Sequence, residues 1–200
     1  FSGLFTQGMV CHETYKDEYD NWVSPDELII KDGKKFLKST EKKVKVGPSE
    51  SMSKSKRNTI DPEKIIESYG ADSVRLFILA DSPPEKDVQW SNEGINASYK
   101  FIQKLWVLNQ KIIEEIEANH PSNPNNDLEK ITNKFIKEIT QNIESFSYNK
   151  IIANFHETYS ALNKIILNKI EREKLIENYK KILIAINPII PRFSNECMEM

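Results

Sequence analysis

The stretch that decides the fold is Ile95–Ile116, which reads INASYKFIQKLWVLNQKIIEEI. Apolar residues recur in it at intervals of three, four or seven positions, namely Ile95, Tyr99, Ile102, Trp106, Ile113 and Ile116. One face of an α-helix collects residues at these intervals. The pattern therefore predicts a long amphipathic helix whose apolar stripe, Trp106 included, is buried in a core.

Three more helices are expected after this one, over 128–145, 149–170 and 173–185. A linker, Pro121–Asn126, precedes them, and Asn187–Pro191 follows the last. The residues expected to face inward are Leu128, Ile131, Phe135, Ile139 and Ile143 in the first, and Ile152, Phe155, Tyr159, Leu162 and Ile166 in the second. Short connections between helices of this length predict an antiparallel bundle.

Two short helices are expected before the long one. Asp61 suits an N-cap, Pro62 suits the first helical position, and Gly70 can end the helix in a left-handed conformation. Asp72 is the expected N-cap of the second helix, which Pro83-Pro84 stops. That helix should bury Val74, Phe77 and Ile78.

The first 50 residues carry strand signals. Leu4–Val10 is a short apolar run, broken by Gly8, that favours a buried strand. Residues 22–47 mix short alternating pieces with the turn signals Asp32-Gly33 and Gly47-Pro48, which predicts a small β-rich excursion.

The composition excludes several classes of protein. With 28 Lys and Arg against 30 Asp and Glu among 200 residues, the chain is neither a uniformly basic nucleic-acid coat nor an acidic tail. Its apolar runs are too short for a membrane span, and its start lacks the features of a signal peptide, so we expect a cytoplasmic protein. Cys11 and Cys197 lie far apart and are expected to be free thiols. Because Phe1 opens the chain, we expect a piece of a longer polypeptide.

Charge is concentrated in residues 31–57, where ten basic residues face three acidic ones, a net charge of +7. The rest of the chain carries 18 basic and 27 acidic residues, a net charge of −9. A positive segment in a negative body attracts phosphates. A solvated lysine-rich loop is the alternative that the charge pattern alone leaves open.

Within that segment, Ser51–Asn58 reads SMSKSKRN and precedes the Asp61-Pro62 helix start. Small hydroxyl residues leave the backbone free to wrap a ligand, and lysine ammonium groups can reach phosphate oxygens. The stretch therefore favours a phosphate-binding loop, with an inert linker as the alternative. Its two Ser-x-x-Lys spacings do not indicate acyl transfer, because the Ser-Asp-Asn and Lys-Thr-Gly motifs that accompany them in such enzymes are absent.

The neighbours of this loop strengthen the functional interpretation. In chain order they are Gln7-Gly8-Met9-Val10, Asn21-Trp22-Val23-Ser24-Pro25, the loop itself, Tyr69-Gly70-Ala71-Asp72 with Arg75, and Ile182–Arg192. This order resembles the class I aminoacyl-tRNA synthetases, and within them the leucine-specific branch of bacterial type. The resemblance covers nearly the whole chain. Arg192 stands where the family usually has a histidine.

The resemblance implies an α/β remnant of a doubly wound nucleotide-binding domain followed by a mainly α antiparallel helix bundle. It divides the chain into four parts: 1–20, the end of the nucleotide-binding domain; 21–50, a small β-rich leucine-specific insertion; 51–90, the catalytic loop and a short helical connector; and 91–200, a truncated anticodon-binding-type bundle. The histidine-containing ATP motif, the first half of the sheet and the editing domain are absent from the chain.

The implied activity is amino-acid activation with ATP and Mg²⁺, followed by transfer of the leucyl group to tRNA(Leu). Lys54 inherits the catalytic role over the departing phosphates, and Met52, Ser53, Lys54 and Ser55 inherit ATP binding. No metal ligand is assigned, no membrane partner is expected, and a monomer is favoured. The isolated piece should be inactive.

One departure from the family matters, because Ser51 replaces the first lysine of the loop. Lys56 or Arg57 are candidates to compensate for it. Ser53 and Ser55 are expected to shape the loop rather than act as nucleophiles. The alternatives are an isoleucyl, valyl or methionyl relative, and a non-catalytic nucleic-acid-binding helical module with a basic arm.

Other polar residues are expected to have no catalytic role. Cys11-His12-Glu13 is interpreted as a surface turn, and His120 and His156 as solvated side chains. For Asp72 and Arg75 a local structural role, an N-cap and an ion pair, is favoured over substrate contact.

Overall fold

The computed structural model describes residues 3–121 and 127–199, so most of the expected linker at 121–126 lies outside the described residues. The chain forms two compact units. The first contains the residues up to Ser68 together with Glu85–Asn92, and the second contains Tyr69–Pro84 and the residues from Glu93 onward. The first is called the sheet unit below and the second the bundle. The division of the sequence into four parts stays a prediction.

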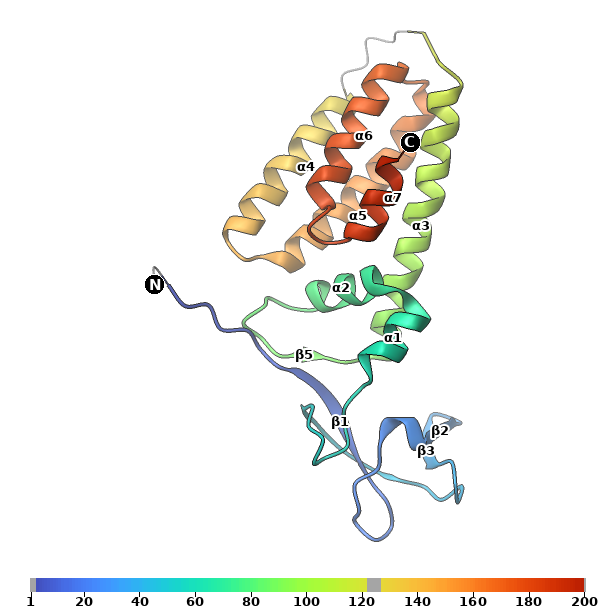
Figure 1. The fold of residues 1–200 in the computed structure, drawn as a ribbon, viewed down its shortest axis with the longest axis vertical. Helices are drawn as coiled ribbons and strands as arrows, with labels where there is room; N and C mark the ends of the chain where they lie inside the picture. The colour runs from blue at the N-terminus through green and yellow to red at the C-terminus, as the bar shows by residue number, and fades with distance from the viewer. Residues whose placement is uncertain (1–2, 122–126, 200) are drawn as a thin grey trace. The chain divides into compact units, whose positions relative to one another are not determined.

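The sheet unit is built on strand β1, Val10–Lys16. It pairs antiparallel with β4, Lys45–Ser51, and parallel with the two-residue strand β5, Val88–Gln89 (Figure 1). The prediction of a buried strand over Leu4–Val10 was wrong, because the strand begins only at Val10 and Leu4 is 88% exposed. An apolar run becomes a buried strand only if a partner covers it, and no strand covers residues 4–9 within the described part of the chain.

A bulge interrupts the pairing of β1 with β4. Glu13 pairs with Ser49 but Tyr15 pairs with Val46, so Thr14 faces both Gly47 and Pro48. Thr14 Oγ1 donates a hydrogen bond to the Pro48 carbonyl at 3.1 Å, and a Cβ on Gly47 would lie 2.5 Å from Thr14 Oγ1. Gly47-Pro48 was predicted to be a turn. The two residues instead lie inside a strand, where a bulge tolerates both the proline and the glycine.

The expected β-rich excursion is present as a hairpin of β2, Leu28–Lys31, and β3, Lys34–Leu37. Its turn is Asp32-Gly33, with φ of 51° and 71°. Two positive φ angles at a two-residue turn match the twist of the flanking strands, and glycine adopts such angles readily. A short 3₁₀ helix η1, Pro25–Glu27, precedes the hairpin, and Tyr15, Val23 and Val44 form a small apolar core.

The first helix, α1, spans Pro62–Tyr69 as predicted, and the Asp61 carboxylate accepts a hydrogen bond from the Glu63 N–H at 3.0 Å. The second, α2, spans Ala71–Ala80. The prediction that Asp72 is its N-cap was wrong, since Gly70 holds that position. Phe77 is buried as expected, whereas Val74 and Ile78 are only partly buried.

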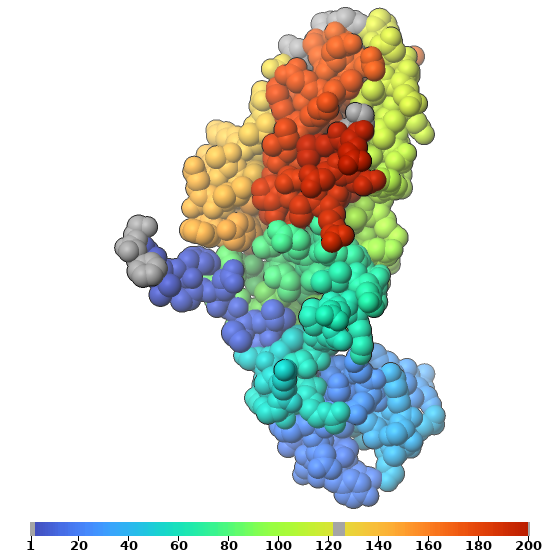
Figure 2. Space-filling view, viewed as in Figure 1, coloured from blue at the N-terminus to red at the C-terminus, as the bar shows by residue number. Residues whose placement is uncertain are grey.

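The bundle contains α3, Asn92–Glu117; α4, Asp127–Glu144; α5, Tyr148–Ile165; and α6, Arg172–Ile186 (Figure 1). The 3₁₀ helix η2, Ile166–Asn168, continues α5. A further helix, α7, Pro191–Met198, was not predicted, although Pro191 starts it in the way that Pro62 starts α1. In the space-filling view α7 covers part of the bundle beside α3 (Figure 2).

The buried face of α3 matches the predicted stripe only in part. Ile95 is buried as predicted, and Ile102 and Ile116 are partly buried against the core. Trp106, however, is 43% exposed, and the helix buries Phe101, Leu105, Leu108 and Ile112 instead. Both faces of α3 carry apolar residues, so spacing alone could not decide which of them meets the core. In the same way Ile143 of α4 was expected inside and is 39% exposed, while Phe135 and Ile139 are buried as predicted.

Candidate functional site

The loop at residues 51–58 connects the end of β4 to the region before α1. The Met52 N–H donates to the Val10 carbonyl at 3.1 Å, which extends the β1–β4 pairing by one residue. The chain then turns between Lys54 and Arg57, where the Arg57 N–H donates to the Lys54 carbonyl at 3.3 Å. Arg57 has a φ of 52°, so the turn ends in a left-handed residue.

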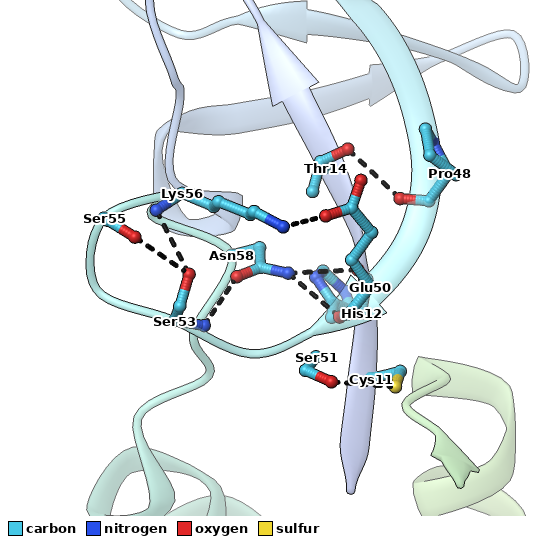
Figure 3. A network of polar contacts seen from close by, with 10 residues as sticks. All are labelled: Cys11, His12, Thr14, Pro48, Glu50, Ser51, Ser53, Ser55, Lys56 and Asn58. Atoms are coloured by element: carbon cyan, nitrogen blue, oxygen red, sulfur yellow. Dashed lines mark hydrogen bonds and ion pairs between the residues drawn. The ribbon is translucent and has the colours of Figure 1, made fainter.

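Hydroxyl groups hold the interior of the loop. Ser53 Oγ accepts a hydrogen bond from the Lys56 N–H at 3.3 Å and lies 3.2 Å from Ser55 Oγ. Both contacts lie within the loop, as expected for residues that shape it. Figure 3 shows them beside the strands that carry the loop.

Asn58 anchors the loop to the sheet. Its side chain is fully buried, and its Oδ1 accepts a hydrogen bond from the Ser53 N–H at 2.8 Å. Its Nδ2 donates to the His12 carbonyl of β1 at 3.2 Å and to the Glu50 carbonyl of β4 at 3.1 Å (Figure 3). One amide thus ties the loop to two strands. The sequence interpretation quoted Asn58 only as the end of the loop and missed this role.

The three cations of the loop differ in their contacts. The Lys56 ammonium forms an ion pair with Glu50, and the Arg57 guanidinium reaches Glu27 at 2.9 Å and the Trp22 carbonyl at 3.2 Å. Lys54 is exposed, and among the described residues the structure records no ion pair or hydrogen bond of its ammonium. Lys54 therefore gives the loop one positive charge that is not paired with a carboxylate of the described residues. Lys56 and Arg57, considered as substitutes for the lysine missing at Ser51, are both engaged elsewhere.

Three other lysines of the basic segment pair with carboxylates from outside it. Lys35 pairs with Glu13, Lys42 with Glu18, and Lys45 with Asp20, the last at 3.0 Å. These carboxylates lie on β1 or just after it, so folding brings them to the segment. The net charge of +7 counted along the sequence is therefore partly offset by folding, which reduces the support for the alternative of a nucleic-acid-binding module with a basic arm.

The interpretation of Cys11-His12-Glu13 as a surface turn was wrong, since all three lie in β1. The Glu13 carboxylate accepts hydrogen bonds from Lys35 and from the Tyr15 hydroxyl, and the hydrogen bond from Lys35 lowers the pKa of Glu13. His12 Nδ1 is buried without a hydrogen-bond partner, and burial lowers the pKa of this imidazole. A neutral histidine is therefore favoured at this position near neutral pH.

Asp72 and Arg75 have a structural role in the bundle, though not the local one predicted. The buried Asp72 carboxylate accepts hydrogen bonds from the N–H groups of Phe193 at 2.7 Å and Arg192 at 3.4 Å. Arg75 donates to the carbonyls of Ile189 at 2.9 Å and Pro188 at 2.6 Å. Arg75 thus satisfies carbonyl groups of the turn between α6 and α7, and Asp72 satisfies N–H groups in the first turn of α7.

Three further findings limit the chemistry of the described residues. Cys11 and Cys197 are free thiols, as predicted, and both are buried; burial raises the pKa of Cys197 to about 12. Residues 3–121 and 127–199 contain no cluster of three His, Cys, Asp or Glu that could hold a metal ion. In the same ranges no helix has the length and apolar character that crossing a membrane requires.

Comparison with protein families identifies the class. Residues 44–91, which include the loop, match the family "tRNA synthetases class I (I, L, M and V)". Residues 125–200 match the "Anticodon-binding domain of tRNA ligase". The first match contains the loop, and the second lies within the helix bundle that follows it in the chain. The chain belongs to the class I tRNA synthetases.

Within this class, the similar curated relatives are leucine–tRNA ligases. The chain is 41% identical over 197 residues to the ligase of Rickettsia massiliae, covering 98% of the chain and 24% of that relative. It is 40% identical over 200 residues to the ligase of Zymomonas mobilis, covering 100% of the chain and 23% of that relative. The chain thus spans about a quarter of the length of the curated relatives it matches.

A solved structure supports the fold. The chain is similar to the Agrobacterium radiobacter K84 agnB2 LeuRS, crystallised as a ternary complex with tRNA and LeuAMS, with a TM-score of 0.65 and 19% sequence identity. The match covers 74% of the chain and 20% of that protein. The small mixed sheet and the helix bundle agree with the predicted fold class at this level. The strands described form a three-stranded and a two-stranded sheet, so the doubly wound domain stays a prediction.

Proposed function

We propose that the protein carrying this chain is a leucine–tRNA ligase that activates leucine with ATP and transfers it to tRNA(Leu). The identity of about 40% to leucine–tRNA ligases over the whole chain supports leucine over isoleucine, valine and methionine. The observation that carries the assignment to chemistry is the uncommitted ammonium of Lys54, on a loop whose other cations are paired.

In the first proposed step a leucine carboxylate oxygen attacks the α-phosphorus of ATP. An acyl–phosphate bond forms, the bond from the α-phosphorus to the bridging oxygen breaks, and pyrophosphate leaves with the electron pair. Negative charge develops on the leaving group, so a cation already in position favours the transition state. Lys54 is proposed to supply that cation. A tRNA ribose hydroxyl then attacks the leucyl carbonyl, and AMP leaves.

Met52, Ser53 and Ser55 are proposed to line the ATP site beside Lys54. The turn from Lys54 to Arg57 leaves the Lys54 and Ser55 side chains exposed, which suits contact with phosphate oxygens. Mg²⁺ is proposed to accompany ATP, and it usually binds through phosphates and one or two carboxylates. The proposal also includes a cytoplasmic, monomeric protein. Its four parts are the end of the nucleotide-binding domain at 1–20, a small β-rich leucine-specific insertion at 21–50, the catalytic loop with a short helical connector at 51–90, and a truncated anticodon-binding-type bundle at 91–200.

The experiment is amino-acid-dependent pyrophosphate exchange by the full-length protein, with leucine, isoleucine, valine and methionine compared side by side. Leucine alone should support rapid exchange. Lys54→Ala should lower its rate by about 10² to 10³, the usual loss for one positioned electrostatic group. Lys34→Ala, which removes an exposed lysine at the start of β3, is the matched control and should leave the rate unchanged.

Two results would overturn the proposal. Equal exchange after Lys54→Ala would remove this lysine from the mechanism. Exchange supported by another of the four amino acids, and not by leucine, would reassign the specificity.

A further inference from the structure

The loop that carries Lys54 has few apolar contacts to hold it. Of the residues from Ser51 to Asn58, only Asn58 is buried, and it is polar. Apolar packing therefore does not fix the position of the Lys54 backbone. Hydrogen bonds must do so, and the geometry of those bonds identifies which residue matters.

The Asn58 amide uses its full donor capacity and one acceptor position. Both Nδ2 hydrogens go to main-chain carbonyls, those of His12 and Glu50, which belong to neighbouring paired strands. The Oδ1 atom accepts from the Ser53 N–H, immediately before Lys54. An asparagine supplies two donors and an acceptor in one planar group, a set that neither aspartate nor serine reproduces.

We propose that Asn58 is a positioning residue, whose side-chain amide fixes the Ser53–Lys54 backbone against β1 and β4 and thereby places the Lys54 ammonium for the activation step. The inference rests on the proposed function. The inference adds to the proposed function the side chain that holds the Lys54 ammonium in place. Asn58 itself is fully buried, so its side chain is not available for contact with substrate.

The consequence for catalysis follows from how strongly rates depend on placement. A displacement of about 1 Å in a catalytic group can cost about 10² in rate. In Asn58→Asp a carboxylate oxygen replaces Nδ2 and faces the carbonyl oxygens of His12 and Glu50. It cannot donate to them, so both hydrogen bonds to the strands are lost. The other carboxylate oxygen can still accept the hydrogen bond from the Ser53 N–H. Asn58→Ala removes all three bonds and leaves space for water to satisfy the carbonyls.

The experiment is a double-mutant cycle in leucine-dependent pyrophosphate exchange by the full-length protein. Asn58→Asp and Asn58→Ala should each lower kcat by about 10², with the KM for leucine unchanged. In a Lys54→Ala background the same changes at Asn58 should have little further effect, because the group that they misplace is already gone. Asn178→Asp is the control, since Asn178 is a buried amide that donates to the Lys174 carbonyl at 2.9 Å within the bundle.

Hydrogen exchange of the loop amides gives a readout independent of activity. Exchange at residues 53–57 should accelerate in Asn58→Ala and stay unchanged in Lys54→Ala and Asn178→Asp. Two results would overturn the inference. One is an unchanged rate of pyrophosphate exchange in both Asn58 variants. The other is a double variant whose loss of rate equals the product of the losses in Lys54→Ala and in the Asn58 variant. If Lys54→Ala itself has no effect on activity while loop exchange accelerates in Asn58→Ala, the proposed function fails and only the anchoring of the loop stands.

Discussion

The bundle and the sheet unit bury different kinds of side chain. In the bundle the fully buried side chains are mainly large and apolar, for example Phe135, which stacks on Phe155 with ring centroids 5.7 Å apart. In the sheet unit the most deeply buried side chains are Asn58 and Thr14, both polar and both hydrogen-bonded to main-chain carbonyls. The bundle is therefore stabilised mainly by buried area, and the loop is fixed mainly by direction-dependent polar contacts.

This contrast agrees with the roles proposed for the two units. A core of apolar residues tolerates small shifts, because the hydrophobic effect has no preferred direction. A loop that must place one ammonium needs contacts that depend on angle and distance, and hydrogen bonds provide them. Three substitutions test the contrast, from the largest expected effect to the smallest.

The largest effect is expected from the core of the bundle. Phe135→Ala removes a buried ring and leaves a cavity, so the free energy of unfolding of the bundle should fall by about 3–5 kcal/mol. Urea denaturation measures it. Ile184→Ala is the control, because Ile184 is 63% exposed and its loss should cost less than about 0.5 kcal/mol. Similar losses in the two variants would contradict the account of an area-stabilised bundle.

A smaller effect is expected where the bundle itself depends on a polar contact. In Asp72→Asn one carboxylate oxygen becomes an amide that faces an N–H group of α7 instead of accepting from it. A buried group left unsatisfied costs about 1–3 kcal/mol, which urea denaturation should detect. Glu129→Gln, an exposed change in the first turn of α4, should leave stability unchanged. Equal stability of Asp72→Asn and the parent would show that α7 does not depend on this carboxylate.

The smallest effect concerns the ion pair of Glu13 with Lys35 in the sheet unit. The hydrogen bond from Lys35 lowers the pKa of Glu13 below its ordinary value of 4.5. The contribution to stability is therefore complete above about pH 4.5 and is lost as the pH falls through the lower pKa of the folded protein. Because Glu13 is partly exposed, we expect less than about 1 kcal/mol.

Tryptophan fluorescence can isolate this effect. Trp22 and Trp90 lie in the sheet unit and Trp106 in the bundle, so Trp106→Phe restricts the signal to the sheet unit. Urea denaturation of that variant should show a steeper loss of stability with falling pH than the same protein with Glu13→Gln. Identical pH profiles of the two proteins would mean that the pair contributes nothing.

Local chemistry predicted much of the fold correctly. The start of α1 at Pro62 with the Asp61 cap, and the Asp32-Gly33 hairpin turn, depend on residues that are adjacent in the chain. The four long helices were also predicted, because each repeats its apolar residues over several turns. The loop around Lys54 was located by its residue types and its position before a helix start.

Three of the errors share one physical cause. Asp72 has the right chemistry for an N-cap, yet its partners are the N–H groups of residues 120 positions away. Gly47-Pro48 has the right chemistry for a turn, yet a neighbouring strand draws it into a bulge opposite Thr14. Trp106 fits an apolar stripe, yet α3 buries Leu105 and Leu108 against the core and leaves Trp106 43% exposed. In each case a distant partner outweighed the local preference.

By itself the sequence determined where α1 begins, where the hairpin turns, that both thiols are free, and that a lysine-bearing loop stands before α1. These features follow from the conformational preferences of single residues and their close neighbours. Only the tertiary structure decided which lysines are neutralised, which face of α3 is buried, and that Asn58 joins the loop to β1 and β4. Such pairings depend on residues far apart in the chain, and packing alone brings them within hydrogen-bond distance.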